Sequence, residues 1–346
     1  MKKNRWKAMA ALAALALSAC GNSGEDGSTQ AAASADAGDA AAAAPTGTGE
    51  GSGEVGKSDI VIAGKSDIKT LDPMGTNDTT SSIAHRHIYS RLIEIDENSE
   101  IVGDLAESWE QVSDTEWKFK IHEGVKFHDG TDCTASDVKF SLERAKEMPR
   151  VKQYVEQIDS ITVEDDHNLT LHLAEPYAPL LAALSHTGTS IVPEAAVTAQ
   201  GDAFWENPIG TGPMQFVEWV PNDHYSLKRF DDYFKGPGKT TSLTLRIMPE
   251  GGARTIALET GEIDMSISVD ATDVQNAKAN KELMALEKTS VSVEYLAMNC
   301  EKEPFNDPLV RKAFSLAIDR NYVVEQVRQA GEIAADAWVP VSVVDA

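Results

Sequence analysis

From Gly21 to Lys57 the chain consists almost entirely of small and polar residues. It has no aromatic residue there, and Val55 is its one aliphatic side chain larger than alanine. Such a segment cannot bury enough apolar surface to offset the entropy lost on ordering. We therefore predict a disordered Ala/Gly/Ser tether over residues 20–57, and we expect the folded body in the roughly 290 residues that follow.

The residues before this tether have the pattern of a secretory signal peptide. A basic start is followed by an apolar stretch from Ala8 to Leu17, which is too short to span a bilayer. The sequence LSAC at 17–20 resembles the lipobox of bacterial lipoproteins, in which the cysteine is lipidated and the chain is cut before it. We predict a signal peptide over 1–19, lipidation of Cys20 and an extracytoplasmic, membrane-anchored protein. The alternative is an ordinary signal peptide with an incidental cysteine.

Charge and cysteine content narrow the classes of partner. The formal net charge is −24, and no cluster of Lys or Arg offsets it, which argues against nucleic-acid binding. Beyond Cys20 the chain has two cysteines, Cys133 and Cys300. We expect two reduced, partly buried thiols, and the alternative is a disulfide between them in an oxidising compartment.

Beyond the tether, several stretches alternate apolar and polar residues, as in strands that bury one face. In TEWKFKI at 115–121 the apolar side chains face one way and both lysines the other. Residues 125–127 are expected to return antiparallel to this strand after a turn at 123–124. The pattern predicts a hairpin from 161–163 and 169–173, and further strands over 58–63, 214–220, 224–230, 242–248 and 263–267.

Helices are interleaved with these strands, which predicts a mixed α/β (α+β) fold class. Thr134 with Asp137 forms a capping box, a short helix over 253–260 ends at Gly261, and Asp307 before a proline begins another helix. The buried positions that helical spacing predicts are Ala84, Ile88 and Leu92 in the first helix, Val138, Leu142 and Ala145 in the second, and Val310, Phe314 and Ile318 in the last.

An ordered series of motifs runs from about residue 58 to the end. It comprises LDP at 71–73, YSRLIEID at 89–96, LAESWE at 105–110, WKFKIHEGVKFHDGTDCTASDVKFSLER at 117–144, PIGTGPMQF at 208–216, TGEID at 260–264 and YLAMNCEKEPFNDPLVRKAFSLAIDR at 295–320. The series resembles the family 5 extracellular solute-binding proteins, receptors of ABC importers for dipeptides, oligopeptides and nickel chelates.

The resemblance implies a periplasmic-binding-protein-like, two-lobed clamshell. Lobe I would comprise 58–76 plus 187–294, and an extra subdomain would occupy 77–186. Residues 295–346 would begin a lobe II that is incomplete here, since family members continue well past this point. The implied function is non-covalent capture of short peptides between the lobes and delivery to a permease by a monomeric receptor. The alternatives are a binding protein for nickel or another chelated cofactor, and a truncated, non-transporting remnant or sensor.

The candidate ligand contacts are two short segments at which the chain would cross between subdomains. The first, Asn77, Asp78 and Thr79, follows LDP and would face the cleft, unless it only caps the helix that contains Ile88. The second segment is His186, Thr187 and Gly188. Backbone groups and short hydroxyl or amide side chains suit recognition of a peptide main chain.

Sequence motifs of catalysis and metal binding are a further guide to function. The sequence has no GxSxG elbow, Walker A loop, HExxH or dinucleotide fingerprint, so we predict neither an enzyme nor a cofactor. His85 and His87, two apart in a helix, lie about 200° apart around its axis and cannot share a metal. We therefore predict no metal site and place the other histidines of the strand-rich region on solvent-facing or turn positions, at His122, His128, His167 and His172.

Overall fold

The computed structural model describes residues 57–267, 269–287, 292–328, 332–335 and 337. All of them belong to one contact unit, Val55–Ala346. The predicted signal peptide, Cys20 and the tether up to residue 56 lie outside the described residues. Among the described residues, no helix has the length and apolar character needed to cross a bilayer.

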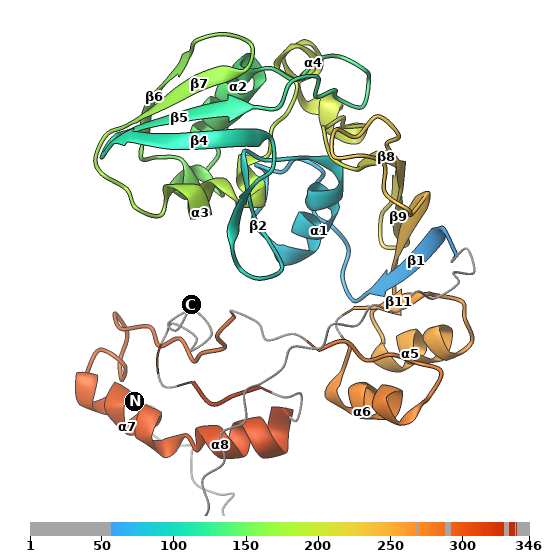
Figure 1. The fold of residues 1–346 in the computed structure, drawn as a ribbon. Coiled ribbons are helices and arrows are strands. Elements are labelled where there is room, and N and C mark those ends of the chain that lie inside the picture. The colour runs from blue at the N-terminus through green and yellow to red at the C-terminus, as the bar shows by residue number, and fades with distance from the viewer. Residues whose placement is uncertain (1–56, 268, 288–291, 329–331, 336, 338–346) are drawn as a thin grey trace, which may run out of the picture. The chain divides into compact units, whose positions relative to one another are not determined.

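A five-stranded sheet combines the first strand of the body with strands from much later in the chain (Figure 1). Its order is β11-β1-β10-β9-β8, and β1 runs parallel to both β10 and β11. The tight turn at 221–223 joins two neighbours into an antiparallel hairpin, and Asn222 adopts a positive φ there. The bounds are Asp59–Gly64 for β1, Met214–Val220 for β8, His224–Arg229 for β9, Ser242–Ile247 for β10 and Met265–Ser266 for β11.

A four-stranded antiparallel sheet lies between β1 and β8 in the sequence, with the order β4-β5-β7-β6 (Figure 1). The predicted alternation is confirmed, because Trp117, Phe119 and Ile121 are buried. The predicted hairpin is β6-β7. The bounds are Ala106–Ser113 for β4, Glu116–Ile121 for β5, Ile158–Val163 for β6 and Asn168–Leu173 for β7; a separate pair joins β2, Ile93–Ile95, to β3, Ile101–Gly103.

The predicted antiparallel return at 125–127 is wrong. The neighbours of β5 are β4 and β7, and residues near 125–127 contribute a single bridge, Lys126 to Asp132. Val125 and Phe127 are buried in the core instead. Their alternation reflects burial of an irregular segment, and the true partner, β4, is a mostly exposed edge strand whose apolar signal is weak.

The helices of this region begin and end as local chemistry dictates. The capping box is confirmed, since the backbone N–H of Thr134 donates to Asp137 at 2.9 Å at the start of α2. The first predicted helix ends at Ile88, so Leu92 is buried beyond it and not within it. The bounds are Thr79–Ile88 for α1, Ala135–Glu147 for α2, Leu180–Leu184 for α3 and Glu194–Gln200 for α4, with 3-10 turns at Lys152–Tyr154 (η1), Thr187–Thr189 (η2) and Gly201–Glu206 (η3).

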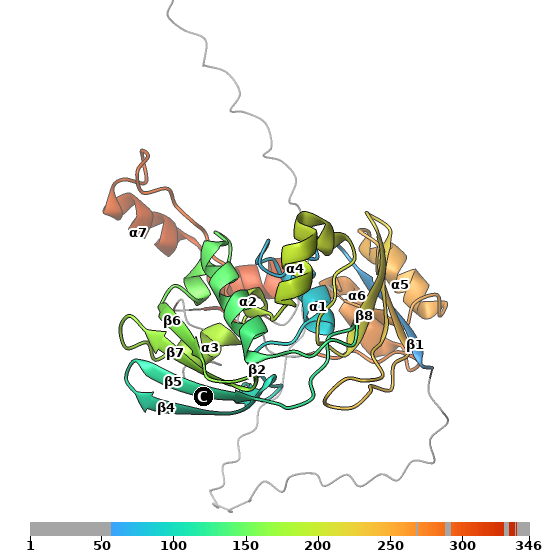
Figure 2. The same cartoon turned by 90° about the horizontal axis from the view of Figure 1, so that it is seen from above.

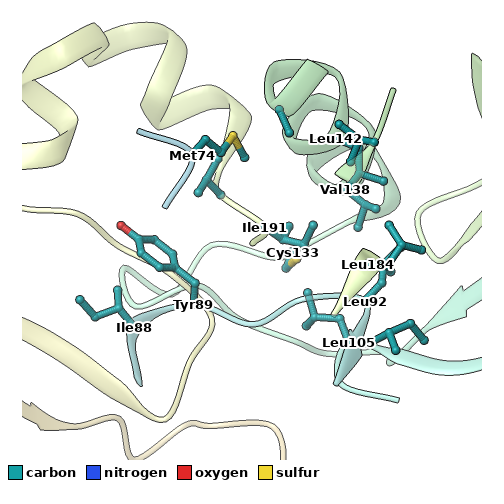
Figure 3. Close-up of a cluster of buried hydrophobic side chains, with 14 of the residues drawn as sticks. Met74, Ile88, Tyr89, Leu92, Leu105, Cys133, Val138, Leu142, Leu184 and Ile191 are labelled. Atoms are coloured by element: carbon teal, nitrogen blue, oxygen red, sulfur yellow. The ribbon is translucent and has the colours of Figure 1, made fainter. Parts of the chain in front are cut away.

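One hydrophobic cluster joins these elements (Figure 3). The predicted stripe of α2 enters it, as do the C-terminal end of α1 and the segments that follow it. The thiol of Cys133 is buried in this cluster, and burial raises its pKa well above its ordinary value. The residues labelled in Figure 3 are Met74, Ile88, Tyr89, Leu92, Leu105, Cys133, Val138, Leu142, Leu184 and Ile191.

After residue 250 the regular structure consists of short helices and the two-residue strand β11, and Figure 2 shows α5, α6 and α7 among them. Gly261 has a φ of 73°, as a residue that follows a helix end requires. Asp307 caps α7 by accepting from the backbone N–H of Leu309, as predicted. The bounds are Gly251–Glu259 for α5, Ala271–Ala279 for α6, Pro308–Ala317 for α7 and Arg320–Tyr322 for α8, followed by a π-helical turn at Val323–Arg328.

Three expectations for this part differ from the structure. The predicted strand over 263–267 is reduced to the two residues of β11. The stripe predicted on α7 is not buried: Phe314 is 45% exposed and Ile318 39% exposed. Within the described residues, the aromatic ring that contacts Phe314 is that of Phe305. Cys300 is exposed, not partly buried.

Candidate ligand-binding site

The first predicted contact segment forms the N-terminus of α1. The carboxylate of Asp78 accepts from the backbone N–H of Ser81 at 3.0 Å and from the Thr76 hydroxyl at 2.7 Å. Burial opposes its ionisation, but these hydrogen bonds outweigh burial and hold the pKa of Asp78 below its ordinary value. Asp78 is therefore a helix cap, while its neighbours Asn77 and Thr79 have exposed side chains.

The second predicted segment forms the 3-10 turn η2. Thr187 and Gly188 are buried, and His186 accepts from the backbone N–H of Gly188 through Nδ1 at 2.9 Å. A Cβ atom at Gly188 would lie 2.3 Å from Cγ1 of Val151, so only glycine fits against this neighbour. The hydrogen bond from Gly188 to His186 and the close contact with Val151 therefore both restrain the turn.

One serine on α1 joins the two segments. The Oγ atom of Ser82 donates to the Asp78 carbonyl at 2.9 Å, and it lies 2.9 Å from Oγ1 of Thr187. The structure therefore brings together two predicted segments that lie about a hundred residues apart in the sequence. Ser82 was not among the predicted contacts.

An aromatic platform stands beside the turn. The ring of His186 stacks on Tyr154 of η1, with centroids 3.8 Å apart and planes 16° from parallel. Burial, together with the charges of Arg86 and Arg91, lowers the pKa of His186 to about 4. His186 is therefore a neutral ring at neutral pH, and because Nδ1 accepts from Gly188, Nε2 carries the proton.

A group of charged residues lies around the C-terminal end of α1 and the segment that follows it. Arg91 is buried, and its guanidinium lies 3.2 Å from Glu94 and 3.9 Å from Asp104. Lys235 lies 2.7 Å from the other oxygen of Asp104. Arg86 carries a further positive charge on α1, with an exposed side chain. The sequence alone did not single out Arg86, because one arginine in a helix makes no pattern. The available signal was its spacing of four residues from Ser82, which places both residues on one face of the helix.

The histidines occupy more varied places than predicted. His128 is not solvent-facing: its Nε2 donates to the Gly212 carbonyl at 3.0 Å, and its Nδ1 accepts from the Gly210 N–H at 3.2 Å. His85 is fully buried and donates to the Thr70 carbonyl. Across the part of the chain that the structure describes, no three His, Cys, Asp or Glu side chains are grouped so that they could hold a metal ion.

The chain belongs to the bacterial extracellular solute-binding proteins, family 5. The family model, described as the family 5 middle region, matches residues 100–345, which is more than half of the chain. The mixed α/β fold predicted from the sequence is confirmed, and it matches solved structures of periplasmic binding proteins.

Curated relatives are binding proteins. The glutathione-binding protein GsiB of Pectobacterium atrosepticum is 30% identical over 290 residues, which cover 82% of this chain and 56% of the relative. GsiB of Escherichia coli K12 is 31% identical over 291 residues, covering 82% and 57%. The chain thus spans little more than half the length of these relatives.

Solved structures give the same picture. DppA from Helicobacter pylori, in complex with the peptide STSA, superposes with a TM-score of 0.72 at 27% identity, covering 79% of this chain and 58% of DppA. NikZ from Campylobacter jejuni, in complex with Ni(L-His), superposes with a TM-score of 0.71 at 26% identity. The match covers 78% of this chain and 55% of NikZ. AppA from Bacillus subtilis, in complex with a nonapeptide, superposes with a TM-score of 0.71 at 27% identity. The match covers 80% of this chain and 57% of AppA.

Proposed function

We propose that this chain is the receptor of an ABC importer, that it captures short peptides non-covalently and that it delivers them to a membrane permease. The observation that carries the proposal is family membership together with the ligands of its relatives. GsiB is named for glutathione, which is a tripeptide, and DppA and AppA were solved with peptides. A peptide main chain is what these ligands share.

The local chemistry of the candidate site supports a peptide ligand. Thr79 and Asn77 offer exposed hydroxyl and amide groups, and the half-buried rings of Tyr154 and His186 form a stacked pair. Hydroxyl, amide and backbone groups hydrogen-bond a main chain without selecting its side chains. The proposed role is capture followed by release, so no bond in the ligand is made or broken.

Isothermal titration tests this proposal. The purified protein would be titrated with dipeptides, tripeptides and longer peptides of defined sequence. We expect saturable binding of at least one length class, with one ligand per chain. Binding of sugars or metal chelates with no response to any peptide would reject the peptide assignment.

A nickel chelate is the second candidate ligand, because NikZ, which shares 26% identity, was solved with Ni(L-His). Elemental analysis of the purified protein, followed by titration with nickel and L-histidine together, separates the two candidates. Binding of nickel only when histidine is present would favour the chelate.

The proposal includes an anchored, monomeric protein with lipidated Cys20 and a tether up to residue 57. We further propose that lobe I combines 58–76 with 187–294, that 77–186 forms its extra subdomain and that 295–346 begin lobe II. The composition of the two sheets supports the first division, since one takes strands from 59–64 and 214–266 and the other from 106–173. Mass spectrometry of the mature N-terminal peptide, compared with a Cys20→Ala variant, tests the anchor.

A further inference from the structure

Arg86 lies on the face of α1 that adjoins the 186–188 turn. Ser82, one helical turn earlier, is in hydrogen-bond contact with Thr187 of that turn. Residues four apart share a helix face, so Arg86 lies on the same face of α1 as Ser82. Arg86 acts on His186 of the turn and is itself acted on by Arg91 and Glu94, so its guanidinium lies near these three residues.

The positive charge of Arg86 is not neutralised by a partner. Among the described residues, its guanidinium makes no hydrogen bond or ion pair. The charges that act on it are those of Arg91 and Glu94, and Glu94 is already engaged 3.2 Å from Arg91. Asp104, the other carboxylate nearby, is held by Lys235 and by the backbone N–H of Arg91.

This neighbourhood therefore carries a local surplus of positive charge. Arg86 and Arg91 act on each other beside the single carboxylate of Glu94, and Asp104 is shared between Arg91 and Lys235. The chain as a whole has a net charge of −24, so the surplus runs against its overall balance. An unpaired arginine beside buried charges is suited to an anionic ligand group.

The same field reaches the aromatic platform. The charges that act on His186 are those of Arg86 and Arg91, and no carboxylate accompanies them. A cationic His186 is disfavoured there, whereas Arg86 is an exposed cation whose charge acts on this ring.

We infer that Arg86 is a specificity-determining residue of the candidate site and that it binds a carboxylate of the ligand through charge-assisted N–H···O hydrogen bonds. The inference rests on the proposed function and names the chemistry that its ligand must carry. The carboxylate is either the C-terminus of a peptide or an acidic side chain. No family 5 motif in the sequence includes this arginine, which precedes YSRLIEID.

Four peptides and three proteins test the inference by titration. The peptides are Ala-Ala-Ala, its C-terminal amide, Ala-Glu-Ala and Ala-Gln-Ala; the proteins are the wild type, Arg86→Gln and Arg86→Lys. For the wild type we expect loss of the relevant carboxylate to weaken binding by about 10- to 100-fold. Amidation identifies the C-terminus as the source, and the Glu-to-Gln change identifies a side chain.

In Arg86→Gln the same loss should cost less than about 2-fold, because the partner is gone, and Arg86→Lys should retain part of the preference. Arg229→Gln, which removes a half-buried arginine of β9 that is paired with Asp231, should keep the carboxylate preference of the wild type. Melting temperatures check that each variant folds.

The outcomes separate the two claims. If the wild type binds peptides but Arg86→Gln shows the same carboxylate dependence, the inference is wrong and the peptide function stands. If the wild type binds none of the peptides of the panel or of the broader set above, the proposed function fails and the inference with it.

Discussion

Arg144 donates a hydrogen bond from each terminal nitrogen to the carboxylate of Asp72, at 3.0 and 2.7 Å, and its guanidinium lies 4.6 Å from the ring centroid of Trp205. Asp72 belongs to the LDP segment, and Arg144 lies near the end of α2. Both side chains are largely buried. This pair fixes the loop that leads into the N-terminus of α1, where one of the two candidate contact segments lies.

Removing one partner of this pair should therefore destabilise the protein. We expect Arg144→Met to lower the free energy of unfolding by about 3 kcal/mol, because it leaves the carboxylate of Asp72 buried and without its cation. Urea denaturation followed by circular dichroism measures the change. Lys120→Met, which breaks the exposed pair with Glu107, should cost under about 1 kcal/mol. Equal losses in the two variants would contradict the assignment.

His128 should make stability depend on pH between about 4 and 6.5. Burial lowers its pKa to about 4 in the folded state, against 6.5 in the unfolded chain. Between these values the unfolded chain binds more protons, so the free energy of unfolding falls as the pH falls. The full loss of stability is about 3 kcal/mol; it is absent above pH 6.5 and complete near pH 4. Urea titrations at several pH values measure it.

His128→Gln should weaken this pH dependence while lowering stability at pH 7, since it removes the neutral ring that joins Gly210 and Gly212. His224 supplies a control of opposite sign, because its hydrogen bond to Asp223 raises its pKa. His224→Gln should remove a contribution that is present below pH 6.5 and lost at higher pH. An unchanged pH profile in His128→Gln would contradict the prediction.

Gly188→Ala should disturb the candidate site directly. The added methyl group would lie 2.3 Å from Cγ1 of Val151, so the turn or the valine must move, at a cost of about 1–3 kcal/mol. We expect weaker ligand binding, measured by titration, together with a lower melting temperature. Gly238→Ala is the matched control, since nothing lies within 4 Å of the added atom. Unchanged binding in Gly188→Ala would remove this turn from the site.

Asp78 tests whether the first segment acts as a cap or as a ligand contact. Asp78→Ala should cost about 1 kcal/mol of stability, because Ser81 loses its acceptor at the start of α1. Asp78→Asn should retain most of that stability, because asparagine also caps helices well. Thr79→Val leaves the cap in place and should reduce peptide affinity in titrations. If affinity follows Asp78 and ignores Thr79, the carboxylate itself contacts the ligand.

The strands that bury one face could be predicted from the sequence, and those that bury little could not. Phe119 and Leu171 lie on strands whose alternation is strong, so β5 and the β6-β7 hairpin were predicted correctly. The strand β4 exposes most of its residues at the edge of the sheet, which removes the periodic signal. Leu92 was assigned to α1 because burial continues past the helix end.

The candidate site was only partly predictable. Its two segments were predicted as crossings between the expected subdomains, and their connection depends on a contact between Ser82 and Thr187 that no local pattern encodes. Arg86 escaped notice because its significance depends on which neighbouring carboxylates are already paired. Such information belongs to tertiary structure.

The place of β1 in its sheet has a consequence for biosynthesis. Asp59 pairs with Ser242, which is made 183 residues later, and β11 follows later still. Strand β1 therefore leaves the ribosome before either of its neighbouring strands has been made. All four strands of the sheet of 106–173 have been made well before β10 and β11. Strand pairing at this distance in sequence is slow. In a nascent chain with that order of synthesis, the five-stranded sheet can be completed only after Ser266 of β11 has been added.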